Sequence, residues 1–579
     1  MKPWFSGVFG RRVFAGSFLS TSARHVFSIA AATVICLTSC ALLANSKNIT
    51  RKARPRTNAR ADGYVGNEVC ARCHAEIYES YMHTAMARSS GTAADNLIAG
   101  EFTHKKSGVH YSIYQENGKA WLSFERPGDP LVHGRRELLY YIGEGRRGRT
   151  YLFSVDGFVF ESPVNWYADR KVWDMAPAYG NAREGPLNLP ATTGCLNCHM
   201  SGIRPPRQGT ENEYPTPVFF YSGVTCERCH GPGAAHVNGG KVVNPVKLPA
   251  NLRDQVCMQC HLEGNAAIER AGKHLYEYSP GQDLSSFVRY FVTSGGGKKN
   301  LRATSQFEAL AQSACKKKSG DSMSCVSCHN PHKTVAKENR VAHYRAICIA
   351  CHGEAFAEKH HVSQRDCTLC HMPASLSSDV AHTEVTDHRI LRTPRTGPAT
   401  SESRTALEPL VPFPPTEEAR KDVRDLALAW QTVAEGVPAA QPEAELLLTE
   451  ALHASPGDPA LLSGLAYIDQ RRGETQQASA LYERALKIDP TSVDAATDLG
   501  VLDASQGRLA EAVKLWQPAF ERAPERSAIG MNLAYAFCGV SQFTEARNYV
   551  LRVLRFNPDL GAAKKLLHKL NGTPPHCGP

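Results

Sequence analysis

The chain has 579 residues and a formal net charge of +10, with 66 Lys and Arg residues against 56 Asp and Glu. Residues 1–60 hold ten basic residues and no acidic one, so in residues 61–579 the 56 basic residues equal the 56 acidic ones. This balance argues against a nucleic-acid-binding surface, and the length predicts several domains.

Residues 1–44 predict a signal peptide or a membrane anchor. Three arginines precede an uncharged stretch, Val26–Ala44, that is rich in Ala, Leu, Ile and Val. Cys40 ends a Leu-Thr-Ser-Cys segment that resembles a bacterial lipoprotein box, in which it would carry lipid. Cleavage near Ala44 and an uncleaved anchor are the alternatives. We therefore expect a periplasmic or otherwise extracytoplasmic protein. Residues 45–63 are expected to form a basic tether after the N-terminal segment.

Cysteine spacing gives the strongest signal in the chain. Fourteen of the 19 cysteines form seven Cys-x-x-Cys pairs, and a histidine follows each pair directly. In chain order the motifs are Cys70, Cys73 and His74; Cys195, Cys198 and His199; Cys226, Cys229 and His230; Cys257, Cys260 and His261; Cys325, Cys328 and His329; Cys348, Cys351 and His352; and Cys367, Cys370 and His371. On a helix, this spacing puts two thiols and an imidazole on one face, where they can bond the vinyl groups and the iron of one haem. A zinc site pairs two Cys-x-x-Cys units and has no need of a histidine after each one. The motifs predict seven covalent haem c groups with these histidines as proximal iron ligands.

The 121 residues between Cys73 and Cys195 contain β-hairpin signals. Alternating apolar residues flank Asn117-Gly118, and a second such pair of runs flanks Asp156-Gly157, both strong turn dipeptides. We expect a small β insertion at about residues 100–175. Its many aromatic side chains are expected to serve packing. The rest of residues 64–395 has weak periodicity, which predicts short helices and loops around the haems, in a mainly α chain.

The C-terminal part shows an internal repeat. Pro456, Pro490, Pro524 and Pro558 are each 34 residues apart, and small residues recur with the same period. This pattern resembles the tetratricopeptide repeat, whose paired helices stack into an α-α superhelix. We expect a Pro-rich linker at residues 396–416 and the repeats at residues 417–571.

Several motifs resemble those of the large multihaem cytochrome family, which includes the tetrahaem cytochrome of ammonia oxidation, hydroxylamine oxidoreductase and pentahaem nitrite reductase. The carriers are Cys226-Glu-Arg-Cys-His-Gly-Pro-Gly-Ala-Ala-His236, Cys325-Val-Ser-Cys-His-Asn-Pro-His332 and Cys367-Thr-Leu-Cys-His-Met-Pro373, all within residues 64–395. In such proteins a histidine beyond one haem motif commonly ligates a neighbouring haem. The resemblance implies distal iron ligands at His83, His236, His332, His382 and His388, with His361, shortly before the last motif, as a further candidate. Of the remaining histidines in this region, His104, His110, His133, His274 and His343 are expected to be structural.

We expect extracytoplasmic electron transfer through the seven haems, with redox partner proteins and a protein or peptide bound at the repeats. The alternative is a multihaem oxidoreductase acting on a small nitrogen or sulfur compound at one open haem, located at the first haem and the β insertion. The related nitrite reductase marks its active haem with lysine, and the sequence contains no Cys-x-x-Cys-Lys motif. We identify no catalytic residue.

Overall fold

The structure is a computed structural model that describes residues 62–180, 182–294, 301–360, 366–393 and 407–577. The expected signal or anchor, Cys40 and His361 lie outside the described residues. Within the described ranges, no helix combines the length and the apolar character that a membrane crossing requires.

A ten-stranded antiparallel sheet follows the first Cys-x-x-Cys-His motif. Its strands are β1 (Ser90–Thr92), β2 (Gly100–Thr103), β3 (His110–Glu116), β4 (Lys119–Glu125), β5 (His133–Ile142), β6 (Gly148–Val155), β7 (Phe158–Glu161), β8 (Val164–Tyr167), β9 (Val172–Met175) and β10 (Leu189–Pro190). The main path is β10-β7-β6-β5-β4-β3-β2; β1 pairs with β5, and β8 pairs with β6 and β9. Both predicted hairpins form, because Asn117-Gly118 and Asp156-Gly157 adopt the positive φ angles that tight turns need.

The expected mainly α class is therefore only partly right. Strands make up 16% of the chain, and the sheet runs from Ser90 to Pro190, beyond both ends of the small insertion that we expected. The short strands β1 and β10 could not be predicted, because two- and three-residue strands carry no periodic pattern. Tertiary pairing with β5 and β7 creates them.

Eleven short helices lie in the described part of the motif region, and several of them carry the motifs. They are α1 (Asn67–Ala71), α2 (Ala75–Met82), α3 (Thr193–His199), α4 (Glu227–His230), α5 (Ala234–Val237), α6 (Ala250–His261), α7 (Gln306–Gln312), α8 (Ala314–Ser319), α9 (Arg340–His352), α10 (Glu354–His360) and α11 (Cys367–His371). Small ladders pair β11 (Ser201–Ile203) with β12 (Phe219–Tyr221), β13 (Ala266–Glu269) with β14 (Val288–Thr293), and β15 (Ala374–Leu376) with β16 (Glu384–Thr386). β17 (Leu410–Phe413), in the expected linker, adds to β14 and leads the chain from the motif region into the repeats.

Paired helices form the C-terminal array. After α12 (Glu417–Lys421) they are α13 (Val423–Gly436), α14 (Gln441–Ala454), α15 (Pro459–Arg472), α16 (Thr475–Ile488), α17 (Val493–Ser505), α18 (Leu509–Arg522), α19 (Ser527–Gly539), α20 (Phe543–Phe556) and α21 (Gly561–Leu570). The recurring small residues lie at helix contacts: a Cβ on Gly500 would collide with the indole of Trp516. A disulfide joins Cys538 of α19 to Cys577 in the tail beyond α21.

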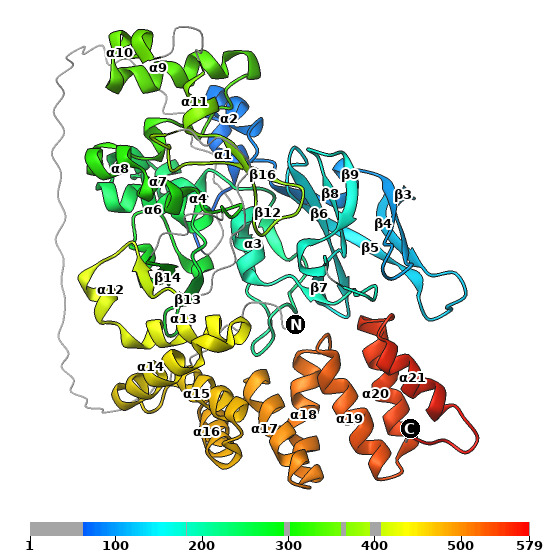
Figure 1. Ribbon diagram of the computed structural model, residues 1–579. Coiled ribbons are helices and arrows are strands. Elements are labelled where there is room, and N and C mark those ends of the chain that lie inside the picture. Colours follow the sequence, from blue (N-terminus) through cyan, green and yellow to red (C-terminus); the bar gives the residue numbers. More distant parts are fainter. Residues whose placement is uncertain (1–61, 181, 295–300, 361–365, 394–406, 578–579) are drawn as a thin grey trace, which may run out of the picture.

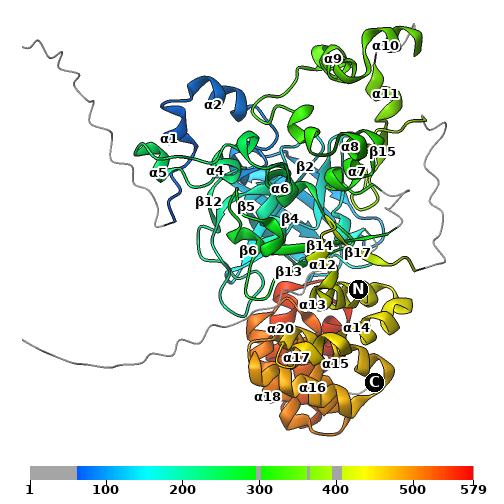
Figure 2. The ribbon, with the colours of Figure 1, turned by 90° about the vertical axis from the view of Figure 1, so that its left-hand side faces the viewer.

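The array lies along one side of the molecule, with its last repeats against the ten-stranded sheet, whereas α9 and α10 lie at the opposite end (Figures 1 and 2). Phe556 of α20 is 5% exposed, and its ring centre lies 6.1 and 5.9 Å from those of Phe158 and Phe160. The buried Asp559 accepts a hydrogen bond from the Gly185 amide at 2.6 Å and pairs with Arg126. The repeats and the sheet thus share one core.

Candidate haem sites

The local fold presents the motif histidines at helix ends. Helices α3, α4, α6, α9 and α11 each end on the histidine of their motif, and His74 caps the start of α2. The fifth motif begins a 3-10 turn, Cys325–Ser327, and its histidine follows in the loop. No further helical turn follows a residue at the end of a helix. Its imidazole can therefore extend away from the helix.

Four motif histidines face a second imidazole that comes from elsewhere in the chain. The ring centres are 6.3 Å apart for His74 and His236, 5.8 Å for His230 and His332, 6.2 Å for His329 and His388, and 6.0 Å for His371 and His360. Two metal–nitrogen bonds of about 2 Å, plus about 1.1 Å from each nitrogen to its ring centre, give about 6.2 Å. Each pair therefore fits one iron bound on both faces.

In three of these histidines the second ring nitrogen makes a hydrogen bond to a backbone carbonyl. Nδ1 of His230 lies 2.8 Å from the Val243 carbonyl oxygen and Nδ1 of His388 lies 2.9 Å from that of Thr386. Nδ1 of His371 likewise contacts the carbonyl oxygen of Leu391. A carbonyl accepts, so Nδ1 carries the proton and Nε2 keeps its lone pair for a metal.

Desolvation by surrounding protein atoms favours the neutral form of several partly exposed imidazoles in this region, the form that a metal ligand must have. It lowers the pKa of His199 to about 4, and it also lowers the pKa values of His329, His332 and His388.

The helices around the last two motifs have no apolar partner in the part of the protein that the structure describes. None of the side chains of α9, α10 and α11 is buried, and even the apolar Phe356 and Leu369 are 52% and 61% exposed. Helices of 13 residues or fewer are marginal in water without an apolar partner. The porphyrin faces would supply that partner.

None of the fourteen motif cysteines forms a disulfide, so each pair is available for haem attachment. Their exposure differs: Cys73 of the first motif is exposed, whereas Cys370 of the last motif, on α11, is half-buried. Free thiols fit the predicted attachment but do not by themselves test it. Haem bonding at each pair, Cys367 and Cys370 included, therefore stays a prediction.

Thiol contacts link the motifs to one another. The thiol of the first motif's Cys70 interacts with that of Cys226 in the third, and the second and fourth motifs meet through Cys198 and Cys260. The fourth and fifth motifs meet through Cys257 and Cys325, and the sixth and seventh meet through Cys348 and Cys367. Between the fifth and sixth motifs, Cys328 and Cys351 are close enough to interact electrostatically. Cys229 of the third motif also lies near Cys260. All seven motifs therefore belong to one connected cluster.

Three family descriptions match parts of the chain. Residues 177–231 match "Cytochrome c554 and c-prime", residues 318–357 match "Doubled CXXCH motif", and residues 442–499 and 470–515 match "Tetratricopeptide repeat". The multiheme cytochrome MtrA of Shewanella baltica is 24% identical over 219 residues, which cover 33% of this chain and 63% of that protein. The chain is a multihaem c-type cytochrome with tetratricopeptide repeats.

Solved structures resemble a smaller part of this cytochrome. Pseudomonas aeruginosa pilF is 22% identical, with a TM-score of 0.24, over 26% of this chain and 68% of its own. MamA from Desulfovibrio magneticus RS-1 is 18% identical, with a TM-score of 0.24, over 26% of this chain and 84% of its own.

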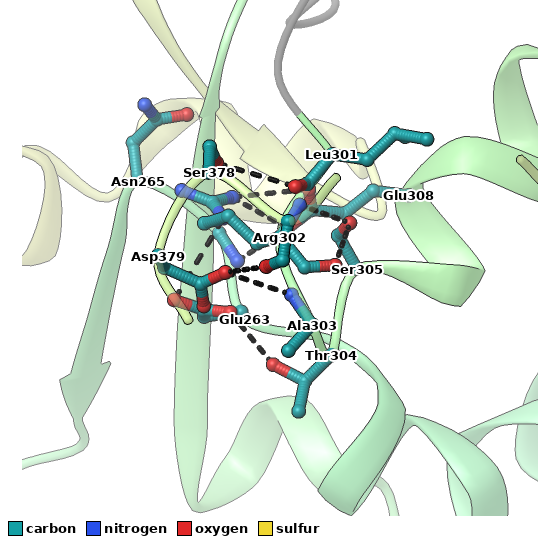
Figure 3. A network of polar contacts seen from close by, with 12 residues as sticks. Glu263, Asn265, Leu301, Arg302, Ala303, Thr304, Ser305, Glu308, Ser378 and Asp379 are labelled. Carbon is teal, nitrogen blue, oxygen red and sulfur yellow. Dashed lines mark hydrogen bonds and ion pairs between the residues drawn. The ribbon is translucent and has the colours of Figure 1, made fainter. Parts of the chain in front are cut away.

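In this cytochrome a polar network holds the surroundings of the fourth motif (Figure 3). Thr304 donates a hydrogen bond to Glu263 at 2.6 Å, and the Ala303 amide donates one to Asp379 at 3.0 Å. The same segment carries Gln306, whose side-chain oxygen lies 3.2 Å from Nδ1 of the motif's histidine. The network therefore holds in place the segment that carries Gln306, the hydrogen-bond partner of the fourth motif's His261.

The other predicted distal ligands lie differently. His83 is exposed just after α2, and Nε2 of His382 lies 2.8 Å from Oδ2 of Asp174 on β9. Their assignment as iron ligands stays a prediction, as does that of His361. For His199, His261 and His352 of the second, fourth and sixth motifs, the described residues place no second imidazole at the separation of the four pairs.

One candidate ligand was missed by the sequence reading. His360 faces His371 of the seventh motif, whereas the sequence favoured its neighbour His361. Adjacent histidines at the end of a helix differ only in the direction of their side chains, so spacing cannot choose between them. The histidines expected to be structural lie largely in polar contacts: His104 with Ser107 at 2.9 Å, and His274 with Glu269 at 2.8 Å. Of the others, His110 contacts Thr103, His133 is exposed, and His343 packs against Tyr344.

Proposed function

We propose that all seven motifs carry haem c and that the protein transfers electrons through them outside the cytoplasm. The observation that carries the proposal is the connected cluster of motifs, in which each motif has a thiol contact with another. Each haem would be bonded through these cysteines, so neighbouring motifs imply neighbouring haems. These contacts, together with the electrostatic neighbours Cys229 and Cys260 and Cys328 and Cys351, support a path from the first motif through the third, fourth, fifth and sixth to the seventh. The second motif branches from the fourth.

Axial ligation by two histidines favours electron transfer at the four paired sites. A second imidazole on iron leaves no position for a substrate, and the protein sets the potential through the ligand, its hydrogen bonds and the polarity around it. His74, His230, His329 and His371 would hold iron on one face, and their partners would hold it on the other. The haem supplies the one-electron chemistry, and the chain supplies position and environment.

The disulfide supports an extracytoplasmic location. Cys538 and Cys577 have Cα atoms 6.2 Å apart, within the range of a protein disulfide. Such bonds persist in oxidising compartments and are rare in the cytoplasm. Together with the N-terminal apolar segment, this bond favours export before the protein matures.

The repeats would bind a protein partner on helix faces that the rest of the chain leaves uncovered. Val501 of α17 and Tyr535 of α19 occupy the same repeat position, 34 residues apart, and are 38% and 49% exposed. The contacts with the sheet instead use residues at the ends of repeats, such as Phe556 and Asp559. Docking at the repeats would therefore leave those contacts in place.

A second candidate function is the reduction or oxidation of a small nitrogen or sulfur compound at an open haem. The first haem, where we expected such a site, has a facing imidazole pair. The second motif is the better place, because no described imidazole stands opposite His199 at that separation and because the sheet packs against Leu196 of this motif. An open iron there would bind carbon monoxide and give a high-spin signal.

Intact mass tests the haem number. Protein matured in a host with cytochrome c assembly machinery should carry seven covalent haems, and peptide masses should place one on each cysteine pair. A mass short by two or more haems would overturn the proposal.

A further inference from the structure

Glu227 lies between the two cysteines of the third motif and is buried, with 2% of its surface exposed. Its carboxylate accepts three hydrogen bonds from backbone amides. The Val65 amide donates to Oε1 at 2.9 Å, and the Gly66 amide donates to Oε2 at 2.9 Å. The Gly233 amide donates to Oε1 at 2.8 Å. One side chain therefore joins two backbone segments that lie on either side of the third motif in the sequence.

The earlier of these segments leads into the first motif. Gly66 directly precedes α1, and the motif ends at His74. Gly66 has a φ of 83°, in the region that favours glycine, and a Cβ there would lie 2.9 Å from a ring carbon of Tyr221. A second bond runs the other way, because the amide of Cys226 in the third motif donates to Oδ1 of Asn67 at 2.9 Å. The start of the first motif is thus tied to the third motif from both sides.

The later segment carries the imidazole that faces the first motif. Gly233 directly precedes α5, which contains His236. The ring centre of His236 lies 6.3 Å from that of His74, with the planes 15° apart. The amide of Ala234 also donates to the carbonyl oxygen of Gly63 at 3.0 Å, so the two segments are bonded to each other as well. Figure 2 shows α1 and α5 beside α4, the helix of the third motif.

A carboxylate suits this position because both of its oxygens accept hydrogen bonds and neither donates one. Bonds from backbone amides to a charged acceptor are shorter and stronger than bonds between neutral groups. A glutamine of the same shape has one oxygen and one NH2 group, and that NH2 group would face a backbone N–H that also donates. Replacement of Glu227 by glutamine should therefore release at least one of the two segments.

We propose that Glu227 positions both axial ligands of the first haem, although it belongs to the third motif. The inference rests on the proposed function, since it requires haem at the first motif. The carboxylate acts on His74 through Gly66, which begins the turn that leads into the motif. It acts on His236 through Gly233, which begins the helix of that histidine. A purely structural carboxylate would lower stability when removed but would leave the ligands of every assembled haem unchanged.

The test is carbon monoxide titration of the reduced, full-length holoprotein, with intact mass to establish equal haem content. Glu227→Gln should bind one equivalent more than the unmodified protein and show one high-spin haem when oxidised. Glu269→Gln is the matched control, because its carboxylate also accepts a backbone amide, that of Leu275 at 2.9 Å. Its other partner is His274, which belongs to none of the four imidazole pairs. The control should bind the same amount as the unmodified protein.

A double variant shows which haem has opened. His236→Ala removes one member of the first pair and should by itself open the first iron. Glu227→Gln combined with His236→Ala should bind no more carbon monoxide than either single variant, because both changes act on the same iron. Two additional equivalents in the double variant would place the effect of Glu227 at another haem and overturn the inference.

Carbon monoxide binding by Glu227→Gln that equals that of the control would leave only a structural role and would also overturn the inference. If that variant does not fold, Glu227→Asp replaces it. The charge stays, but the side chain is one methylene shorter and cannot reach both segments at once, so binding should rise by part of one equivalent; fully closed ligands would count against the positioning role.

Peptide mass shows whether haem occupies Cys70 and Cys73. Its absence from the unmodified protein would contradict the proposed function rather than the role of Glu227. Loss of this haem from Glu227→Gln alone, with the control and the unmodified protein fully loaded, would support the positioning role, because the first motif would then depend on the third for its assembly.

Discussion

Replacement of His332 by alanine should open one iron and leave the others closed. His332 lies in the loop after the fifth motif, and its ring centre is 5.8 Å from that of His230, with the planes 11° apart. Alanine has no donor atom, so the haem of the third motif would keep only its proximal ligand. Because one pair of four is broken, the expected change is one high-spin haem per chain and one additional equivalent of bound carbon monoxide.

The assay compares the spin state of the oxidised protein with carbon monoxide titration of the reduced protein. His104→Ala is the matched control, since it removes a buried histidine that contacts Ser107 in the β-sheet region and faces no motif histidine in the four pairs. Haem content from intact mass must be equal in both variants. An unchanged spectrum for His332→Ala would refute its role as a ligand, and a high-spin signal in both variants would point to general loosening of the fold.

Three further outcomes follow from the geometry. His360→Ala should open the haem of the seventh motif while His361→Ala does not; carbon monoxide binding by the second variant alone would reverse the assignment. Asp559→Ala removes a buried carboxylate that pairs with Arg126 and Lys564, and it should destabilise the contact between repeats and sheet by about 3 kcal/mol. The exposed Glu417→Ala should cost less than about 1 kcal/mol. Denaturant unfolding followed by circular dichroism measures both variants, and equal effects would contradict the prediction. Cys577→Ser should lower the stability of the last repeat by about 2–4 kcal/mol, seen as faster hydrogen exchange in α19 and α21, whereas unchanged exchange would show that the disulfide constrains little.

The repeats illustrate what a sequence settles alone. Their 34-residue period fixes which residues meet, because each helix pair contacts only its neighbours along the chain. The haem-binding motifs are equally local, since two thiols and an imidazole within five residues suffice to recognise them. The two hairpins formed as expected for the same reason, through turn residues between adjacent strands.

Long-range contacts were decided only by the tertiary structure. His236 is identified by its place beyond the third motif, but which iron it faces depends on how distant loops meet, and the structure places it opposite His74. The extent of the sheet and the insertion of Phe556 into its core depend likewise on pairing between separated segments. The sequence alone determined the kind of cofactor chemistry and the repeat architecture, because both are written in short or periodic patterns. Only the folded chain decided which histidines face one another, because side-chain direction and loop closure are set by packing across the whole molecule.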